Sequence, residues 1–253
     1  MNDTEYSSDS DKLSDELRQL SKDPLQSAAA LYAAQEIFGR EVRTETRKCY
    51  GGLAEAHMLV SGVLGSAILR TNGKITPITS TFEEVNALYA SFVIGLNLCE
   101  LAIEEGRYIQ ACALLRQEME TVAQIKNVRV GKRNPTRAPN IAFLEEYMKR
   151  LYGGLSDAAH VSKHHILRQV TVMEITGRDF PEATIATRYF PGFDGTFARR
   201  LFALHIMLIA YVIEEMSVDI LERLPDDAFT PDDQDAITRA MSLMKEEGML
   251  ESF

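Results

Sequence analysis

Apolar residues recur at helical spacing along nearly the whole chain, and this periodicity leaves few alternatives to a helical fold. Pro24 suits the first turn of the first long segment, and Asn72-Gly73 and Gly106 are helix stop signals. The segments lie at about 25–50, 53–69, 82–105, 108–128, 140–167, 196–224 and 231–249. The sequence therefore predicts an all-α fold, a single multi-helix bundle of about six or seven helices.

One stretch departs from the helical period. Residues 170–176 alternate between apolar and polar side chains, residues 177–181 contain turn-forming Gly and Pro, and residues 183–190 can return as a second strand. We expect a small two-stranded β ribbon near 170–190. Because an isolated ribbon has no core of its own, it should lie on the helices.

The acidic side chains gather at the two ends of the chain. The formal net charge is −10, of which residues 1–22 contribute −3 and residues 225–253 contribute −6. We expect a disordered acidic N-terminal tail over 1–22 and a helical domain over 23–224. An amphipathic C-terminal helix within 225–253 should pack on the domain or on a partner. Such a chain is not typical of nonspecific nucleic-acid binders, although it is compatible with a local basic groove.

Cysteine usage and apolar run lengths predict a cytoplasmic protein. Cys49, Cys99 and Cys112 form no CxxC pair, and their odd number suits free thiols in a reducing compartment. The first residues lack the apolar core of a signal peptide. The longest apolar runs, 58–69 and 201–213, are shorter than the roughly 20 residues of a membrane span. We expect no membrane contact, and homo-oligomer contacts through apolar helix faces.

The main site candidate is a set of polar residues on two otherwise apolar helices. Tyr152, Ser156 and His160 are spaced by four residues and share one helix face, and Arg116 and Glu120 do the same one helix earlier. As catalytic residues, His160 would transfer protons, Arg116 would stabilise phosphate charge, and the other three would orient them. As structural residues, the same five would form a buried polar network between the helices.

Neither a metal nor a cofactor is predicted. His160 and His164 have the spacing of a metal-binding pair, but no acidic third ligand lies beside them, and no HExxH, phosphate-loop, GxGxxG or GxSxG motif occurs. A basic loop between the two site helices is the other electrostatic feature. It can contact phosphate or RNA, or it can be a solvated connection. Its cations are Lys126, Arg129, Lys132, Arg133 and Arg137.

Two resemblances bear on function. Ala-Leu-Leu-Arg-Gln-Glu-Met-Glu-Thr at 113–121, followed by Tyr-Gly-Gly-Leu-Ser-Asp-Ala-Ala-His at 152–160, resembles a family of uncharacterised bacterial helical proteins. That resemblance implies no established activity, but it favours the same five site residues. Arg200 and His205 form an Arg-x4-His pattern that resembles HEPN domains of bacterial toxin and antiviral systems, whose active members cleave RNA without a metal. Leu201 stands where a polar residue often follows that arginine, and His205 also fits a core histidine.

The sequence leaves three functions open. The chain can be a helical interaction module, a small-molecule-binding protein with a polar pocket between two central helices, or a HEPN-like metal-independent ribonuclease or nucleotide-directed hydrolase of a defence system. We favour interaction or ligand binding over catalysis, and the sequence does not decide whether the chain is an enzyme.

Overall fold

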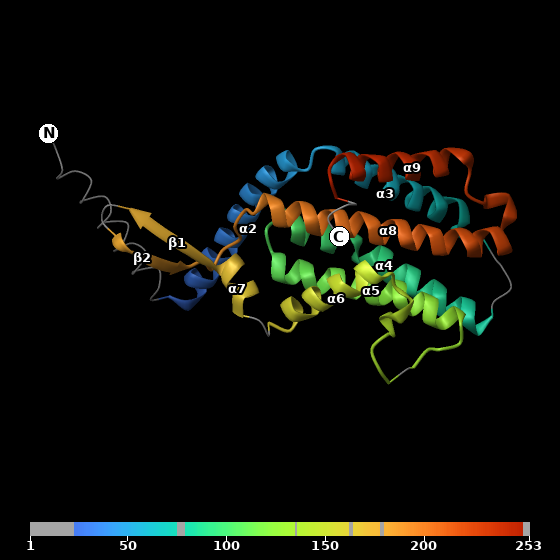
Figure 1. The fold of residues 1–253 in the computed structure, drawn as a ribbon, viewed down its shortest axis with the longest axis horizontal. Coiled ribbons are helices and arrows are strands. Elements are labelled where there is room, and N and C mark those ends of the chain that lie inside the picture. Colours follow the sequence, from blue (N-terminus) through green and yellow to red (C-terminus); the bar gives the residue numbers. More distant parts are fainter. Residues whose placement is uncertain (1–22, 75–78, 135, 162–163, 178–179, 250–253) are drawn as a thin grey trace.

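The computed structural model describes residues 23–249, except 75–78, 135, 162–163 and 178–179. The tail predicted over 1–22 lies outside the described residues. The all-α class is confirmed, because helices make up most of the described chain (Figure 1). The α-helices are α2 (Pro24–Cys49), α3 (Gly52–Thr71), α4 (Ser80–Glu104), α5 (Tyr108–Arg129), α6 (Glu146–Ala159), α7 (His164–Thr171), α8 (Gly195–Arg223) and α9 (Pro231–Glu246). Short 3₁₀ helices span Ile141–Phe143 and Pro225–Asp227.

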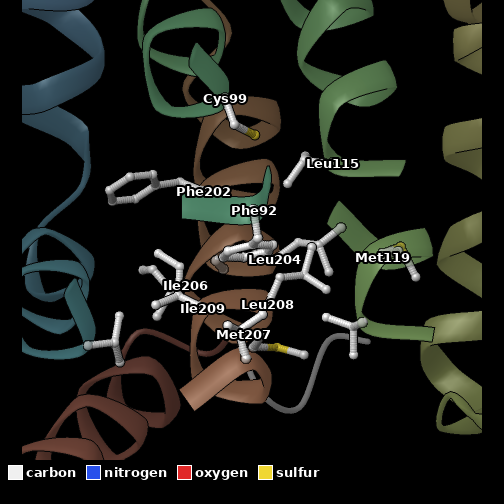
Figure 2. Close-up of a cluster of buried hydrophobic side chains, with 14 of the residues drawn as sticks. Phe92, Cys99, Leu115, Met119, Phe202, Leu204, Ile206, Met207, Leu208 and Ile209 are labelled. Atoms are coloured by element: carbon white, nitrogen blue, oxygen red, sulfur yellow. The ribbon is translucent and has the colours of Figure 1, made fainter. Parts of the chain in front are cut away.

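Helix α8 is the centre of the bundle. All residues from 201 to 209 are buried, so this part of α8 is covered on every side, as expected for a helix that is apolar all round. It packs against α3, α4 and α5, and α9 lies on α3 at the outside of the bundle. Figure 2 shows part of this core, in which Phe92 of α4 and Met119 of α5 lie beside the α8 side chains Leu204 and Leu208.

Several helix ends follow from local capping chemistry. Helix α2 begins at Pro24 after Asp23, whose carboxylate accepts hydrogen bonds from two backbone N–H groups of the first turn. Thr230 and Asp233 form a capping box at the start of α9. Helix α4 begins at Ser80 because Thr79 is its N-cap and accepts from the N–H of Phe82. The helix therefore starts two residues earlier than the sequence predicts.

The single helix predicted over 140–167 is wrong, because this segment is divided. Helix α6 ends at Ala159, and His160 is its C-cap with φ −86° and ψ 2°. Val161 then takes a φ of 48°, a left-handed conformation that no helix continues. The N–H groups of His160 and Val161 close the end by bonding back to Ser156 and Ala158. Because no Gly or Pro marks this break, the apolar periodicity alone runs through it.

Two strands follow α7. Strands β1 (Val172–Gly177) and β2 (Phe180–Thr187) pair antiparallel, with Val172 opposite Thr187 and an irregularity between Ile175 and Gly177. Figure 1 shows both strands at one end of the molecule, away from the bundle. The strands therefore do not contribute to the core around α8.

Three described helices, α3, α4 and α8, are long and apolar enough to cross a membrane by length and composition. The expectation that every apolar run is too short is wrong in this respect. These helices are 20, 25 and 29 residues long, and each contains an 18-residue window of high mean hydropathy in which small and polar residues interrupt the apolar runs. The most apolar window of α8 is 67% buried inside the bundle, against 28% for that of α4. Cytoplasmic location stays a prediction.

Candidate functional site

Arg116 and His160 meet on the surface between α5 and α6. These two helices pack side by side, Arg116 lies in the third turn of α5, and His160 caps the end of α6. The guanidinium Nη1 of Arg116 lies 2.7 Å from the imidazole Nε2 of His160. Because a guanidinium only donates, Nε2 is the acceptor in this contact, which assigns the neutral imidazole with its proton on Nδ1.

Glu120 and Tyr152 fix the position of the guanidinium. Nε of Arg116 donates to Glu120 Oε1 at 3.0 Å and to the Tyr152 hydroxyl at 3.3 Å. The same hydroxyl donates to Glu120 Oε1 at 2.6 Å. The hydrogen bond from Tyr152 is the largest cause that raises the pKa of Arg116, and burial followed by the Glu120 bond raises the pKa of Tyr152. The guanidinium therefore stays charged and is held from the side opposite His160.

Ser156 has a smaller part in this cluster than the sequence predicts. Its backbone carbonyl accepts from the N–H of His160, and the structure shows no hydrogen bond of its hydroxyl to any described residue. Four of the five predicted residues are therefore connected through their side chains, which form the Arg116 cluster: Arg116, Glu120, Tyr152 and His160.

The Arg116 cluster lies at the surface. The side chains of Arg116 and Glu120 retain 20% and 23% of their accessible area, and His160 is exposed. None of the four cavities found among the described residues is lined by a residue of this cluster. A ligand bound here would therefore rest on an open face and not in an enclosed pocket.

The basic loop is remote from the Arg116 cluster. Arg129, at the far end of α5, is about 20 Å along the helix from Arg116. Arg129 and Lys126 form ion pairs with Glu215 of α8, and Arg133 pairs with Glu84 of α4. Much of the positive charge in this segment is thus neutralised by the bundle itself, and a contact with phosphate or RNA stays a prediction.

Arg200 and His205 do not share a site. Arg200 is exposed, whereas His205 is fully buried, because residues five apart point about 140° apart around a helix. His205 Nδ1 lies 2.9 Å from Glu118 Oε2 of α5. His205 is thus a core histidine whose Nδ1 has a partner in Glu118. This agrees with the interpretation of His205 as a core residue, and not with a role beside Arg200.

A buried polar cluster around His205 is absent from the sequence prediction. Cys99 of α4, Glu118 of α5 and His205 of α8 are all buried, and each offers a ligand atom within 4.8 Å of the others. These three residues are called the core triad below. Sequence spacing does not reveal these residues, because each lies on a different, mostly apolar helix. Only the packing of α4, α5 and α8 brings them together.

His57 of α3 borders the core triad. Its ring stacks on that of His205, with 5.7 Å between the ring centroids. Burial, and secondly the neighbouring His205, lowers the pKa of His57 to about 4. His57 is therefore neutral at cellular pH, and its Nε2 lies 3.3 Å from the Ser61 hydroxyl.

Searches against protein-family models, curated proteins and solved structures found no match to this chain.

Proposed function

We propose that this chain is a ligand-binding protein whose Arg116 cluster recognises a phosphate-type anion. The observation that carries the proposal is the 2.7 Å contact between Arg116 Nη1 and His160 Nε2. Two groups that can both donate to an oxyanion face each other at an open surface. A phosphate oxygen can accept from both, and the guanidinium is already oriented by Glu120 and Tyr152.

Proton uptake accompanies binding in this proposal. The neutral imidazole accepts from Arg116 in the free protein, whereas a protonated imidazole and the guanidinium would repel each other. An anion bridging them replaces that repulsion with two charge-assisted hydrogen bonds.

Thermal unfolding with and without inorganic phosphate or pyrophosphate tests the proposal, with sodium chloride at equal ionic strength as the salt control. We expect pyrophosphate to raise the melting temperature of the parent protein, because a ligand that binds the native state stabilises it. Arg116→Gln and His160→Gln should each weaken binding by about 10-fold to 100-fold, the equivalent of one charge-assisted hydrogen bond.

Arg150→Gln is the matched control, since it removes an exposed cation from the same helix as His160 outside the Arg116 cluster. Circular dichroism of each variant shows whether the fold is intact. Equal affinity in folded Arg116→Gln, His160→Gln and Arg150→Gln proteins would show that the anion binds elsewhere.

The same contact favours a second candidate, metal-independent phosphodiester cleavage. An exposed imidazole can take the proton from a ribose hydroxyl, and an adjacent guanidinium can stabilise the charge that develops on the phosphate. The HEPN resemblance suggests this activity, although through Arg200 and His205, which do not share a site. Incubation of single-stranded RNA with the parent protein and His160→Ala discriminates the candidates. Cleavage that His160→Ala abolishes would establish catalysis here, and parent protein that binds RNA without cleaving it would leave the binding function.

A further inference from the structure

The core triad joins three helices at the centre of the bundle. Cys99 and His205 are fully buried and Glu118 retains 6% of its accessible area. Cys99 lies at the edge of the hydrophobic cluster drawn in Figure 2, with Phe92 and Leu115 nearby. A carboxylate in such surroundings is costly unless it is paired and fully hydrogen-bonded. The buried Glu118 carboxylate therefore needs partners that compensate its charge and complete its hydrogen bonds.

Two polar atoms of the triad have no protein partner. Oε1 of Glu118 and Nε2 of His205 are buried and make no hydrogen bond to any described residue. The Glu118–His205 bond uses only the other oxygen and the other ring nitrogen. Buried polar groups of native proteins are nearly always paired, so two orphaned atoms in one cluster indicate a missing partner.

We infer that Cys99, Glu118 and His205 form a binding site for a divalent transition-metal ion of the zinc type. A thiolate, an imidazole and a carboxylate are ligands that zinc accepts, and three protein ligands leave a fourth position open. Tetrahedral bonds of about 2.0–2.3 Å separate ligand atoms by roughly 3.3–3.8 Å. The triad atoms lie within 4.8 Å of one another, so small side-chain rotations complete this geometry.

Charge balance supports a divalent cation. A thiolate and a carboxylate carry two negative charges, a neutral imidazole carries none, and a divalent ion therefore makes the buried site neutral. The bound ion replaces the proton of the Cys99 thiol, which is released to solvent, whereas the neutral His205 imidazole keeps its single ring proton.

One member of the triad borders a cavity between α4 and α5. Glu118 lines a cavity of about 210 Å³, whose other walls include Ser91, Leu98 and Thr121. The site thus has ligands of the right chemistry, and it is separate from the Arg116 cluster.

Metal binding by the full-length protein tests the inference. The chain is stripped with a chelator, titrated with Co²⁺ and with Zn²⁺, dialysed and measured for metal content. We expect one equivalent of tightly held metal per chain and, for Co²⁺, the intense thiolate-to-metal absorption and tetrahedral ligand-field bands of a cysteine-bound ion. Titration in weak buffer should also release about one proton per bound ion, because the ion displaces the proton of the Cys99 thiol.

Cys99→Ser and Glu118→Gln nearly preserve side-chain volume, and each should lower metal affinity by at least 10-fold while Cys99→Ser removes the thiolate absorption. Cys112→Ser is the control, since Cys112 is a second buried free thiol outside the triad. Should a variant fail to fold, cobalt spectroscopy of the parent protein still decides the matter. A parent protein that retains less than a tenth of an equivalent after dialysis, or a folded Cys99→Ser protein with unchanged affinity and spectrum, would overturn the inference.

Discussion

Glu247 connects four helices and should contribute measurably to stability. It caps the end of α9, and its Oε1 accepts from the backbone N–H of Gly52 at 2.5 Å, at the start of α3. Its Oε2 accepts from Arg199 Nη2 of α8 at 2.6 Å. Arg199 also donates to the backbone carbonyls of Cys49 and Tyr50 at the end of α2. Removal of the carboxylate therefore loosens the junction of α2, α3, α8 and α9.

The size of the effect follows from these contacts. A hydrogen bond to a charged group contributes about 1.5–3 kcal/mol, and a carboxylate at a helix N-terminus adds about 0.3–1 kcal/mol. The Glu247 side chain retains 26% of its accessible area, so solvent screening reduces the gain. Arg199 keeps its two carbonyl acceptors. We expect Glu247→Gln to lower the free energy of unfolding by about 1–2 kcal/mol and Glu247→Ala by about 2–3 kcal/mol.

The effect should depend on pH in one direction. The Arg199 hydrogen bond and then the Gly52 N–H lower the pKa of Glu247 in the folded protein. A lowered folded-state pKa means that the stabilisation is complete above the pKa of the unfolded chain and disappears as the pH falls through the folded-state value. The difference between parent and Glu247→Gln should therefore be constant above about pH 5 and shrink between about pH 5 and pH 3.

Urea unfolding followed by circular dichroism at several pH values measures this difference. Glu246→Gln is the control, because Glu246 is 63% exposed and its nearest cation lies 3.9 Å away, so it should change stability by less than about 0.5 kcal/mol. If Glu247→Gln matched Glu246→Gln at neutral pH, or if its effect were the same at all pH values, the carboxylate would not be holding the four helices.

Three further substitutions test the packing. Gly52→Ala would place a Cβ 2.9 Å from Glu247 Oε1, and it should lower the free energy of unfolding by about 1–2 kcal/mol in the same urea assay. Gly153→Ala, in α6 with no atom within 4 Å of the added Cβ, should instead raise it by up to about 1 kcal/mol through helix propensity. Phe202→Ala should cost about 3–5 kcal/mol, because this side chain is 2% exposed and stacks on Tyr50 at 3.9 Å between ring centroids. If Phe202→Ala lowered the free energy of unfolding by less than Gly52→Ala does, Phe202 would not be a main contributor to the core.

The sequence predicts a helix boundary well where residues adjacent in the chain determine it. Pro24 after Asp23, and Thr230 before Pro231, determine helix starts through bonds made within one turn. The start of α4 is harder, since Thr79, Ser80 and Thr81 are equivalent capping residues in sequence. The end of α6 at His160 is harder still, because Val161 adopts its left-handed conformation without the glycine that normally signals it.

At Gly51 and Gly52 the sequence predicts a break between two helices, but it does not predict the contact that the break makes possible. Helix α2 ends at Cys49 with Tyr50 as its C-cap, and Gly51, the N-cap of α3, takes a φ of 55°. The N–H of Gly52 then binds the carboxylate of Glu247, which lies 195 residues further along the chain. No local pattern contains that partner. The same limit explains why the core triad escapes a search that considers one helix at a time.

Helix α5 contributes residues to both candidate sites, on opposite faces. This arrangement explains why the sequence predicts the Arg116 cluster but not the core triad. Residues 116–120 read Arg-Gln-Glu-Met-Glu, a mostly polar stretch that by itself is typical of a solvated surface. On a helix, Arg116 and Glu120 share the face toward α6, whereas Glu118 lies about 200° from Arg116 and faces α8. Spacing by four residues reveals the first pair, but a single glutamate on the opposite face has no partner on its own helix. The role of Glu118 depends on Cys99 and His205, so a residue that looks solvated in the sequence forms a buried contact between α5 and α8.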